Sequence, residues 1–273
     1  MEDGPYDLLQ AMGDDLWTQH AGLVEALAQH TRPGEVVYLI PHGKLHQAPL
    51  HALPVDGVPL AIRNPVGYSP SLASLVLQVQ LGKSEGWDRV AIFGDPQENL
   101  PKTRLGAQQL ATAWGQAPKL GKEVTAAALA IALRSADLVH FGGHGRYYPT
   151  RPQSSGLVMG DDSVFTVKQI QDLPVHSKLV VLEGCQTGQQ DYFVGDEFTG
   201  LVYSFLMGGA AQVLASMWKV SSNSSSEIMQ FFHEALHQGL PTILALHRAI
   251  SRYRDQYPNH SLFHWAPYAL YGA

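Results

Sequence analysis

The sequence predicts an α/β protein in which helices cover both faces of a largely parallel β-sheet. Three observations lead to this fold class. Short apolar runs, often β-branched, recur along the chain, and each one ends at Gly, Pro or Ser, as buried strands commonly do. Helical patterns separate these runs. Strands that alternate with helices are typical of an α/β/α sandwich.

The expected strands and helices follow one another along the chain. The strands are Val36–Ile40, Arg89–Phe93, Asp137–Phe141, Lys178–Glu183, Gln212–Met217 and Pro267–Tyr271. The helices between the later strands are Thr125–Arg134, Phe198–Met207, Ser224–Gln238 and a final one from Pro241 to about Gln256. For the third helix, Ser224 and Glu227 have the spacing of a capping box, and Gly239 follows its end.

The first part of the chain differs in character from the rest. A helix over about Tyr6–His30 leads into the first strand, followed by a Pro/His-rich stretch and a turn-rich segment. Lys83–Asp88 is polar, contains glycine and precedes a strand, so it is the best internal boundary. We therefore expect an N-terminal lobe over residues 1–85 and a catalytic core over residues 86–273.

Composition excludes several classes of protein. The formal net charge is -6 and no basic stripe is visible, which argues against a nucleic-acid platform. The acidic start, MEDGPYDLLQ, lacks the pattern of a secretory signal. No apolar run approaches the roughly 20 residues that span a bilayer, so no membrane contact is expected. The chain is expected to be cytoplasmic.

The chain contains a single cysteine, Cys185. This excludes an intrachain disulfide and any zinc site with two or more thiolates. A lone free thiol is usually a small buried apolar group. Only its surroundings can favour a catalytic role over that structural one.

Two expected strands end in segments that can carry chemistry. Leu138–Gly145 reads LVHFGGHG, and Leu179–Gly188 reads LVVLEGCQTG. In open parallel sheets, functional groups collect beyond the carboxyl ends of the strands, so neighbouring ends would bring His144 and Cys185 together. A thiol within reach of an imidazole is a nucleophile–base pair. The glycines allow close backbone approach, and their N–H groups can face a developing oxyanion.

These two segments resemble the His-Gly and Cys boxes of CHAT-domain proteins, relatives of caspases and separases among the clan CD cysteine peptidases. The resemblance extends over nearly the whole chain. YLIPHGKLHQAPLHAL and GYSPSLASL are similar to N-terminal stretches of the family. VGDEFTGLVYSFLMGGAAQVLASMWKVSS and HWAPYALYG resemble the stretch that follows the nucleophile and the closing strand.

The resemblance implies a caspase-like α/β/α fold and a Cys/His dyad that needs no metal, no cofactor and no third carboxylate. It assigns the nucleophile to Cys185 and the base to His144. The backbone N–H groups of Gly145 and Cys185 would form the oxyanion hole. Many CHAT domains are catalytically idle and bind partner proteins, so a scaffold role is the alternative function.

Specificity residues are expected around the nucleophile. Glu183 precedes Cys185 by two positions and should emerge on the same side of the strand. A buried carboxylate needs a partner, either a substrate Arg or Lys or an internal group, and we favour the substrate cation. The clostripain-like peptidases and metacaspases resemble this arrangement. Asp196 and Glu197 are alternative acids, or else charges of a solvated loop. The edge that contains Ser216 and Trp218 is expected to pair with the substrate backbone, although Trp218 could equally belong to the core.

Other residues invite competing interpretations. His140 lies on a strand and is expected to be a core residue rather than a metal ligand. His42, His46 and His51 have ligand-like spacing, but no thiolate and few carboxylates lie nearby, so no metal site is expected. Ser69, in GYSPS, lacks the second glycine of a nucleophile elbow, which leaves a serine hydrolase poorly supported.

The resemblance also suggests protein partners. The expected substrate is a protein, and CHAT peptidases often work beside sensor proteins in bacterial defence. Two segments, Arg146–Ser155 and Gln186–Asp196, are polar or rich in Pro and Gly and should be accessible to proteolysis. Cleavage at Arg151 by this or another peptidase could activate the chain, although Arg146 and Arg151 could simply be solvated.

Overall fold

The computed structural model describes residues 21–42, 45, 48–81, 86–146, 148, 150–183, 196–218 and 221–273. The side chains of residues 21, 81, 152 and 196–199 are outside this description.

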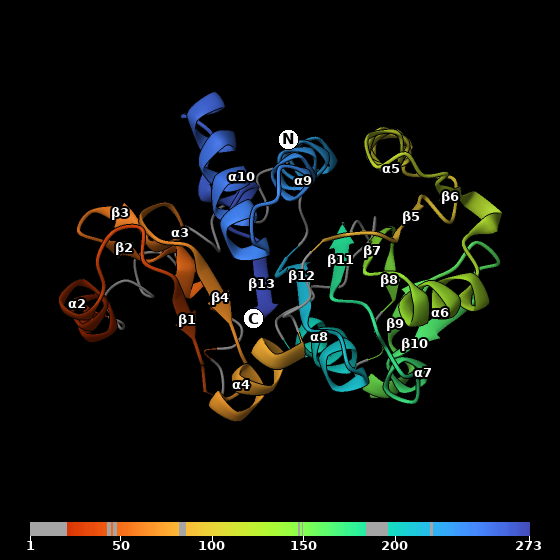
Figure 1. The fold of residues 1–273 in the computed structure, drawn as a ribbon, viewed down its shortest axis with the longest axis horizontal. Coiled ribbons are helices and arrows are strands. Elements are labelled where there is room, and N and C mark those ends of the chain that lie inside the picture. Colours follow the sequence, from red (N-terminus) through yellow and green to blue (C-terminus); the bar gives the residue numbers. More distant parts are fainter. Residues whose placement is uncertain are drawn as a thin grey trace.

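The centre of the molecule is an eight-stranded sheet with the order β1-β4-β13-β12-β11-β7-β5-β6 (Figure 1). Neighbouring strands are parallel except for β12 and β13, so the sheet is mostly parallel, as expected. The strands are β1 (Val37–Leu39), β4 (Val66–Tyr68), β5 (Val90–Gly94), β6 (Lys119–Leu120), β7 (Leu138–Gly142), β11 (Leu179–Glu183), β12 (Gln212–Ser216) and β13 (Tyr268–Gly272).

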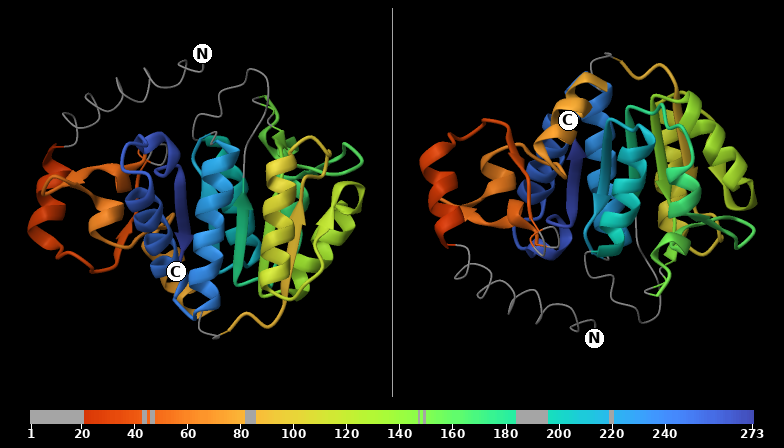
Figure 2. Two further views of the ribbon diagram at one scale, coloured as in Figure 1. Left: turned by 90° about the horizontal axis from the view of Figure 1, so that it is seen from above. Right: turned by 90° about the horizontal axis from the view of Figure 1, so that it is seen from below.

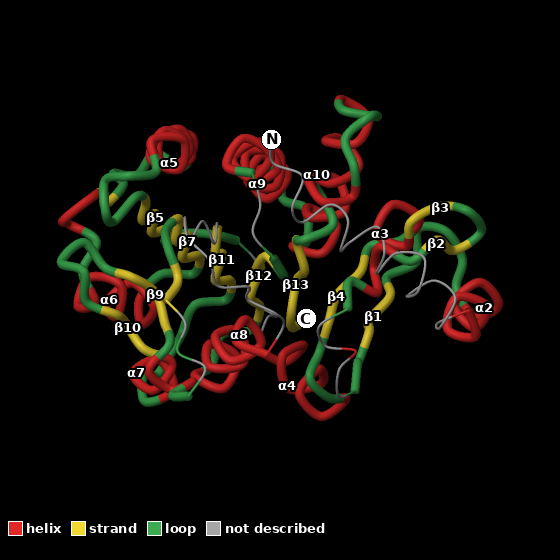
Figure 3. The backbone as a smooth tube through the Cα atoms, turned by 180° about the vertical axis from the view of Figure 1, so that it is seen from behind, coloured by secondary structure: helices red, strands yellow, loops and turns green. Residues whose placement is uncertain are grey.

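Helices cover both faces of this sheet, which gives the predicted three layers (Figure 2). One face carries α5 (Pro101–Ala113), α9 (Ser222–His237) and α10 (Thr242–Gln256). The other carries α4 (Leu72–Leu81), α6 (Ala126–Ser135), α7 (Val167–Gln171) and α8 (Asp196–Gly208). Seen from behind, the strands form the middle layer between these two groups of helices (Figure 3).

Two hydrophobic clusters fill the space between the layers because side chains alternate along each strand. On β7, Leu138 packs with the cluster under α9 and α10, whereas Val139 and Phe141 pack with the cluster under α6 and α8. All five residues of β7 and of β11 are buried. Buried, largely aliphatic strands of this kind are typical of a sheet that is covered on both faces.

Shorter elements flank the sheet. At one end lie α2 (Ala21–His30), the 3-10 turn η2 (Leu50–Ala52), the pair β2 (Pro54–Val55) and β3 (Val58–Pro59), and α3 (Leu60–Arg63). Towards the other end, β8 (Gly145–Arg146), β9 (Gly156–Val158) and β10 (Val164–Thr166) form a small antiparallel sheet. The remaining short turns are η3 (Gly121–Glu123), η4 (Pro152–Ser154) and η5 (Leu262–His264). Strands β1 and β4 precede residue 85 and belong to the central sheet, so the expected N-terminal lobe contributes two strands to the same sheet as the expected core. A domain boundary at residue 85 remains a prediction.

The six expected strands are all present within two residues of their expected ends. The expected capping box is wrong. Helix α9 begins at Ser222 with Ser221 as its N-cap, and the hydroxyl of Ser224 is hydrogen-bonded to Nδ1 of His264, 2.8 Å away. A capping box does occur in α7, where Thr166 and Gln169 exchange both hydrogen bonds. Of the expected helix over about 6–30, the structure describes residues 21–30, all of them helical.

Candidate functional site

His144 lies beyond the carboxyl end of β7, where the sequence places the base. It follows the strand by two residues and precedes β8. Its side chain is partly exposed, and Nε2 is 2.9 Å from Oδ1 of Asn99. An amide oxygen can only accept a hydrogen bond, so Nε2 carries the proton. In the neutral ring, Nδ1 is therefore the nitrogen that can take a proton from a nucleophile.

Asn99 belongs to the loop that joins β5 to α5, and this loop is anchored to the end of β7. The buried carboxylate of Asp95 accepts the N–H of Leu100 at 2.8 Å, and Arg104 lies 3.4 Å from its other oxygen. The backbone N–H of Asp95 donates to the carbonyl oxygen of Gly142 at 2.9 Å. The loop therefore holds Asn99 against the segment that presents His144.

Strands β7 and β11 are parallel neighbours, as the sequence predicts, with Gly142 opposite Glu183. The N–H of Gly143 donates to the carbonyl oxygen of Glu183 at 3.2 Å. This bond ties the segment before His144 to the end of the strand that leads to the nucleophile box. The arrangement supports the expected meeting of the two strand ends. Cys185 itself lies outside the described residues, so its pairing with His144 stays a prediction.

The glycines before His144 are required by close packing. A Cβ on Gly142 would lie 2.5 Å from a methyl carbon of Thr103. A Cβ on Gly143 would lie 2.9 Å from both Phe141 and Pro96. Both distances are far shorter than van der Waals contact. The Gly-Gly pair thus lets the loop after β5 pack against the end of β7.

Gly145, the expected oxyanion-hole residue, lies opposite Leu157 in the β8–β9 pair. The hydrogen bond beside this pair joins the flanking residues, from the N–H of Val158 to the carbonyl oxygen of His144, at 2.9 Å. Gly145 and Leu157 are therefore not hydrogen-bonded to each other, and the N–H of Gly145 points away from β9. Its use by an oxyanion stays a prediction.

Glu183 has a different environment from the one that the sequence suggested. Its side chain is only 1% exposed, and its Oε2 is 3.0 Å from Nε2 of His140. The hydroxyls of Ser225 and Ser226 donate to Oε1 at 3.2 and 3.3 Å. The argument for a substrate cation rested on the need for a partner, and these internal groups meet that need. The expectation that Glu183 pairs with a substrate Arg or Lys is therefore not supported by its contacts.

The other residues that are expected to bind substrate lie at the same end of the sheet as His144. Ser216 ends β12 and is buried, and its hydroxyl has no hydrogen-bond partner among the described residues. Trp218 is partly buried against both hydrophobic clusters, and its indole N–H donates to the carbonyl oxygen of Phe263 at 3.3 Å. Asp196 opens α8, and its side chain lies outside the described residues. Substrate contacts at these positions stay predictions.

The expectation for His140 is confirmed, since it is a fully buried core residue on β7. His51 is also buried. Its Nδ1 lies 2.7 Å from the hydroxyl of Tyr68, and its Nε2 lies 2.7 Å from the carbonyl oxygen of Ala266. Both ring nitrogens of His51 are thus occupied by protein groups, which excludes it as a metal ligand in this arrangement. Among the described residues, no group of three or more His, Cys, Asp or Glu could hold a metal ion.

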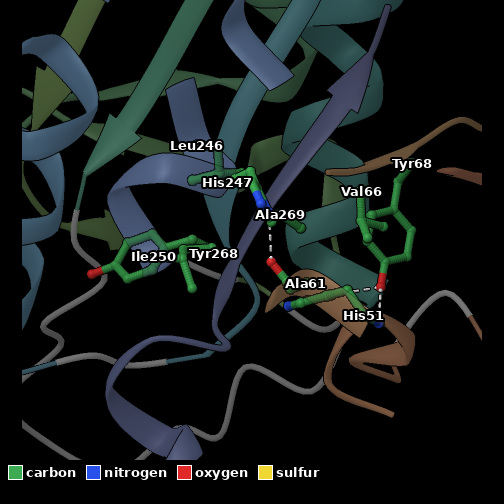
Figure 4. A pocket seen from close by; sticks show the side chains of 9 residues that line it. All are labelled: His51, Ala61, Val66, Tyr68, Leu246, His247, Ile250, Tyr268 and Ala269. Carbon is green, nitrogen blue, oxygen red and sulfur yellow. Dashed lines mark hydrogen bonds between the residues drawn. The ribbon is translucent and has the colours of Figure 1, made fainter. Parts of the chain in front are cut away.

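Figure 4 shows His51 and Tyr68 on the wall of a small cavity of about 10 Å³. On another wall of it, Nδ1 of His247 is hydrogen-bonded to the carbonyl oxygen of Ala61 at 2.9 Å. A space of this size holds at most about one water molecule. Ser69, which follows β4, is buried and donates to the carbonyl oxygen of Ser71 at 3.0 Å. This contact does not activate Ser69 as a nucleophile.

Sequence reasoning missed Asn99, Ser225 and Ser226. The signal for Asn99 was its place after a predicted strand that is adjacent to the His144 strand. The order of strands in the sheet, which turns this into a contact, is not visible in one sequence. The two serines fall in the first turn of the expected helix Ser224–Gln238, and no local pattern connects them to Glu183.

The family comparison identifies the domain. The family model "CHAT domain" matches residues 10–273. The chain belongs to the CHAT family. No curated protein sequence matches this CHAT domain.

Solved structures show which fold the domain shares. The crystal structure of the Saccharomyces cerevisiae separase–securin complex matches with a TM-score of 0.63 and 17% identity over 86% of this chain and 15% of the separase chain. The complex of the Porphyromonas gingivalis RgpB pro- and mature domains matches with a TM-score of 0.50 and 13% identity, over 76% of this chain and 55% of that one.

The domain therefore has a caspase-like α/β fold similar to that of separase, as the sequence predicts. It spans only 15% of the separase chain, so the likeness concerns the fold and not the activity of the whole protein. In the part of the chain that the structure describes, no helix is long and apolar enough to cross a membrane.

Proposed function

We propose that this CHAT domain is a cysteine endopeptidase in which Cys185 is the nucleophile and His144 the base. The observation that carries the proposal is the position of His144. It lies beyond the end of β7, beside the strand that leads within two residues to Cys185, and Asn99 holds its Nε2 proton. The caspase-like fold, shared with separase, supports the same assignment.

The proposed reaction needs only groups of this chain, the substrate and water. The Cys185 thiol gives its proton to Nδ1 of His144, and the thiolate attacks the carbonyl carbon of the scissile peptide. The N–H groups of Gly145 and Cys185 stabilise the oxyanion that forms. When the C–N bond breaks, the leaving amine takes the proton from the imidazolium and an acyl-thioester remains. Water, deprotonated by His144, then hydrolyses the thioester and restores the thiol.

The test is peptidase activity of the wild-type chain and of two variants. Cys185→Ala and His144→Ala should each lower kcat/KM by about a thousandfold or more, because both groups take part in bond formation. A thiol-reactive peptidyl probe should label the wild type and fail to label Cys185→Ala. Full activity of Cys185→Ala would contradict the proposal and point to another nucleophile, with Ser69 as the first to examine.

The alternative function is that of an idle protein-binding module. It predicts that a folded wild-type chain neither cleaves a peptide library nor reacts with the probe. The same library defines specificity. Cleavage after Arg or Lys is the sequence-based expectation, and equal cleavage after Asp, Met or Leu would refute it.

Glu183→Gln then asks whether the carboxylate sets this preference. The amide keeps the shape of the side chain and removes its charge. If a substrate cation pairs with Glu183, kcat/KM for Arg and Lys peptides should fall by about a hundredfold. If Glu183 serves only the internal contacts described above, all peptides should be affected alike.

Control by proteolysis is part of the proposal. Arg151 is exposed, and its guanidinium lies 5.6 Å from the centre of the Tyr148 ring. An exposed arginine that follows the proposed base, His144, closely in the sequence is a suitable cleavage site for this peptidase or for an activating one. Intact-mass measurement during the onset of activity tests this. Full activity of an uncut chain without an added protein would exclude it. A role in bacterial defence, beside a sensor protein, remains the proposed context.

A further inference from the structure

Four side chains, three of them from α9, β7 and β11 and one from the end of α5, form a continuous chain of hydrogen bonds near the candidate site. Nε1 of Trp114, which directly follows α5, is 3.0 Å from Nδ1 of His233 on α9. Nε2 of His233 is 3.1 Å from Nδ1 of His140 on β7. Nε2 of His140 is 3.0 Å from Oε2 of Glu183 on β11.

The direction of every bond in this chain is set by its first member. An indole N–H can only donate, so Nδ1 of His233 must be unprotonated. A neutral imidazole carries one proton, which places that proton on Nε2 of His233, where it is donated to Nδ1 of His140. The proton of His140 must then lie on Nε2 and be donated to Glu183. Trp114 thereby fixes the tautomers of two buried histidines.

The last group of this hydrogen-bond chain is the carboxylate of Glu183, which accepts hydrogen bonds and keeps its negative charge. Oε2 accepts from His140, and Oε1 accepts from the hydroxyls of Ser225 and Ser226. Among the described residues, no ion pair joins Glu183 to a lysine or arginine. A second proton on His140, at Nδ1, would face the Nε2–H group of His233. The hydrogen bonds therefore disfavour an imidazolium at His140, which would neutralise the charge of Glu183.

We propose that Trp114, His233 and His140 form a one-way hydrogen-bond chain that holds Glu183 as a buried carboxylate and fixes the end of β11 behind the nucleophile segment. Glu183 is then a positioning residue. Its side chain is anchored by α9 and β7, while its carbonyl oxygen accepts the N–H of Gly143, next to His144. The same residue thus restrains both strand ends that the proposed dyad needs.

Burial also favours a neutral ring at His233. It lowers the pKa of His233 well below its usual value. Burial raises the pKa of Tyr268, and the negative charge of Glu183 contributes to that shift. Two further titratable groups lie near these side chains. The ring centre of His237 is 5.0 Å from that of Trp114. Glu234 lines, together with Trp114 and His233, a groove of about 330 Å³ between α5 and α9.

The first test needs no enzymatic activity. In the full chain with ¹⁵N-labelled histidine, His140 and His233 should both be neutral, with the proton on Nε2, from pH 5.5 to pH 8. The ¹³C shift of the Glu183 carboxyl group should remain that of a carboxylate over the same range. An imidazolium at either histidine, a proton on Nδ1 of His233, or a protonated Glu183 would overturn the proposal.

Trp114→Phe keeps the aromatic ring and removes the only obligatory donor. We expect His233 in this variant to lose its fixed tautomer, seen as a changed or averaged ¹⁵N signature. Trp87→Phe is the matched control, because the Trp87 ring packs near Lys178 and, among the described residues, is not part of this series of hydrogen bonds. An unchanged His233 signature in Trp114→Phe would show that the indole does not set the direction of the chain.

The consequence for catalysis rests on the proposed function. His140→Phe should lower kcat by about tenfold or more, because the strand ends lose their alignment. His140→Gln should recover most of this loss, since an amide can accept from His233 and donate to Glu183. Full kcat in a folded His140→Phe variant would overturn the positioning role. A wild-type protein without peptidase activity would contradict the proposed function instead. The NMR experiment would still decide whether the hydrogen-bond chain holds Glu183 as a carboxylate.

Discussion

His51 and His140 are both buried, and both ring nitrogens of each are hydrogen-bonded within the protein, but the groups at the ends of these bonds differ. His51 lies between the hydroxyl of Tyr68 and the carbonyl oxygen of Ala266, which are both neutral. The bonds of His140 lead on one side to His233 and on the other to the carboxylate of Glu183.

The difference concerns what a buried imidazole can do. The His51 cluster joins η2 to β4 and to the segment before β13, which stabilises this part of the sheet. The His140 chain joins α9 and β7 to β11, and it also keeps a charge beside the nucleophile segment. We therefore expect changes around His51 to alter the free energy of unfolding, and changes around His140 and His144 to alter catalysis.

The largest expected effect of the His51 cluster is on stability at acid pH. Burial lowers the pKa of His51 to about 4 in the folded chain, and the usual value is 6.5. The unfolded chain therefore takes up a proton first, so this contribution to stability is complete above about pH 6.5 and is lost as the pH falls towards 4. The loss between pH 7 and pH 4 should be about 3 kcal/mol.

Urea unfolding of the wild type and of His51→Gln over this pH range measures that contribution. The variant should be less stable at pH 7 but should lose less stability on acidification. His233 also has a lowered pKa and contributes to the slope in both chains, so the difference between the two chains isolates His51. Parallel curves for the two chains would show that His51 does not titrate as expected.

A smaller effect is expected from Tyr68→Phe. The hydroxyl of Tyr68 contacts Nδ1 of His51 at 2.7 Å and accepts the backbone N–H of the same residue at 3.0 Å. Its loss leaves buried polar groups unpaired and should lower the free energy of unfolding by about 2 kcal/mol. The kcat of the folded fraction should be unchanged. Tyr257→Phe, which removes a hydroxyl near the surface, is the control, with an expected change below about 0.5 kcal/mol.

The fold was largely predictable because its strands carry a strong local signal. Buried runs such as Leu138–Gly142 and Leu179–Glu183 are largely apolar, contain valine and end at or just before a glycine, so their location and type follow from local sequence. Strand β4 was missed because Val66–Tyr68 contains only three residues, one of them glycine. The capping box was misplaced because any of several serines before Glu227 could begin the helix. The serine side chains from 224 to 226 are hydrogen-bonded to His264 and Glu183, and these distant partners are not visible in the local sequence.

The positions of the candidate site residues were predictable where they depend on local sequence and less so where they depend on packing. His144 follows a strand that ends in Gly-Gly, and this local pattern correctly predicted its position beyond the end of β7. The partners of Glu183 come from β7 and α9, more than 40 residues away on either side. One sequence could show that Glu183 needs a partner, but not that His140, two positions before the opposite glycine on the neighbouring strand, would supply it.

The smallest expected effect concerns Asn99, which orients the base from outside the reacting atoms. In Asn99→Ala, water can replace the amide oxygen because this hydrogen bond is exposed, so kcat should fall by only about tenfold while KM stays the same. In Asn99→Asp, the carboxylate keeps the hydrogen bond to Nε2 but favours the imidazolium. A protonated ring cannot accept the thiol proton, so the acid limb of the pH–rate profile should move to higher pH, with activity near that of the wild type above it. Gln97→Ala, in the same loop, is the control, because Gln97 contacts Asp162 and not His144. An unchanged pH profile in Asn99→Asp would show that Asn99 does not set the protonation of His144, and the tautomer assigned to the base would then be wrong.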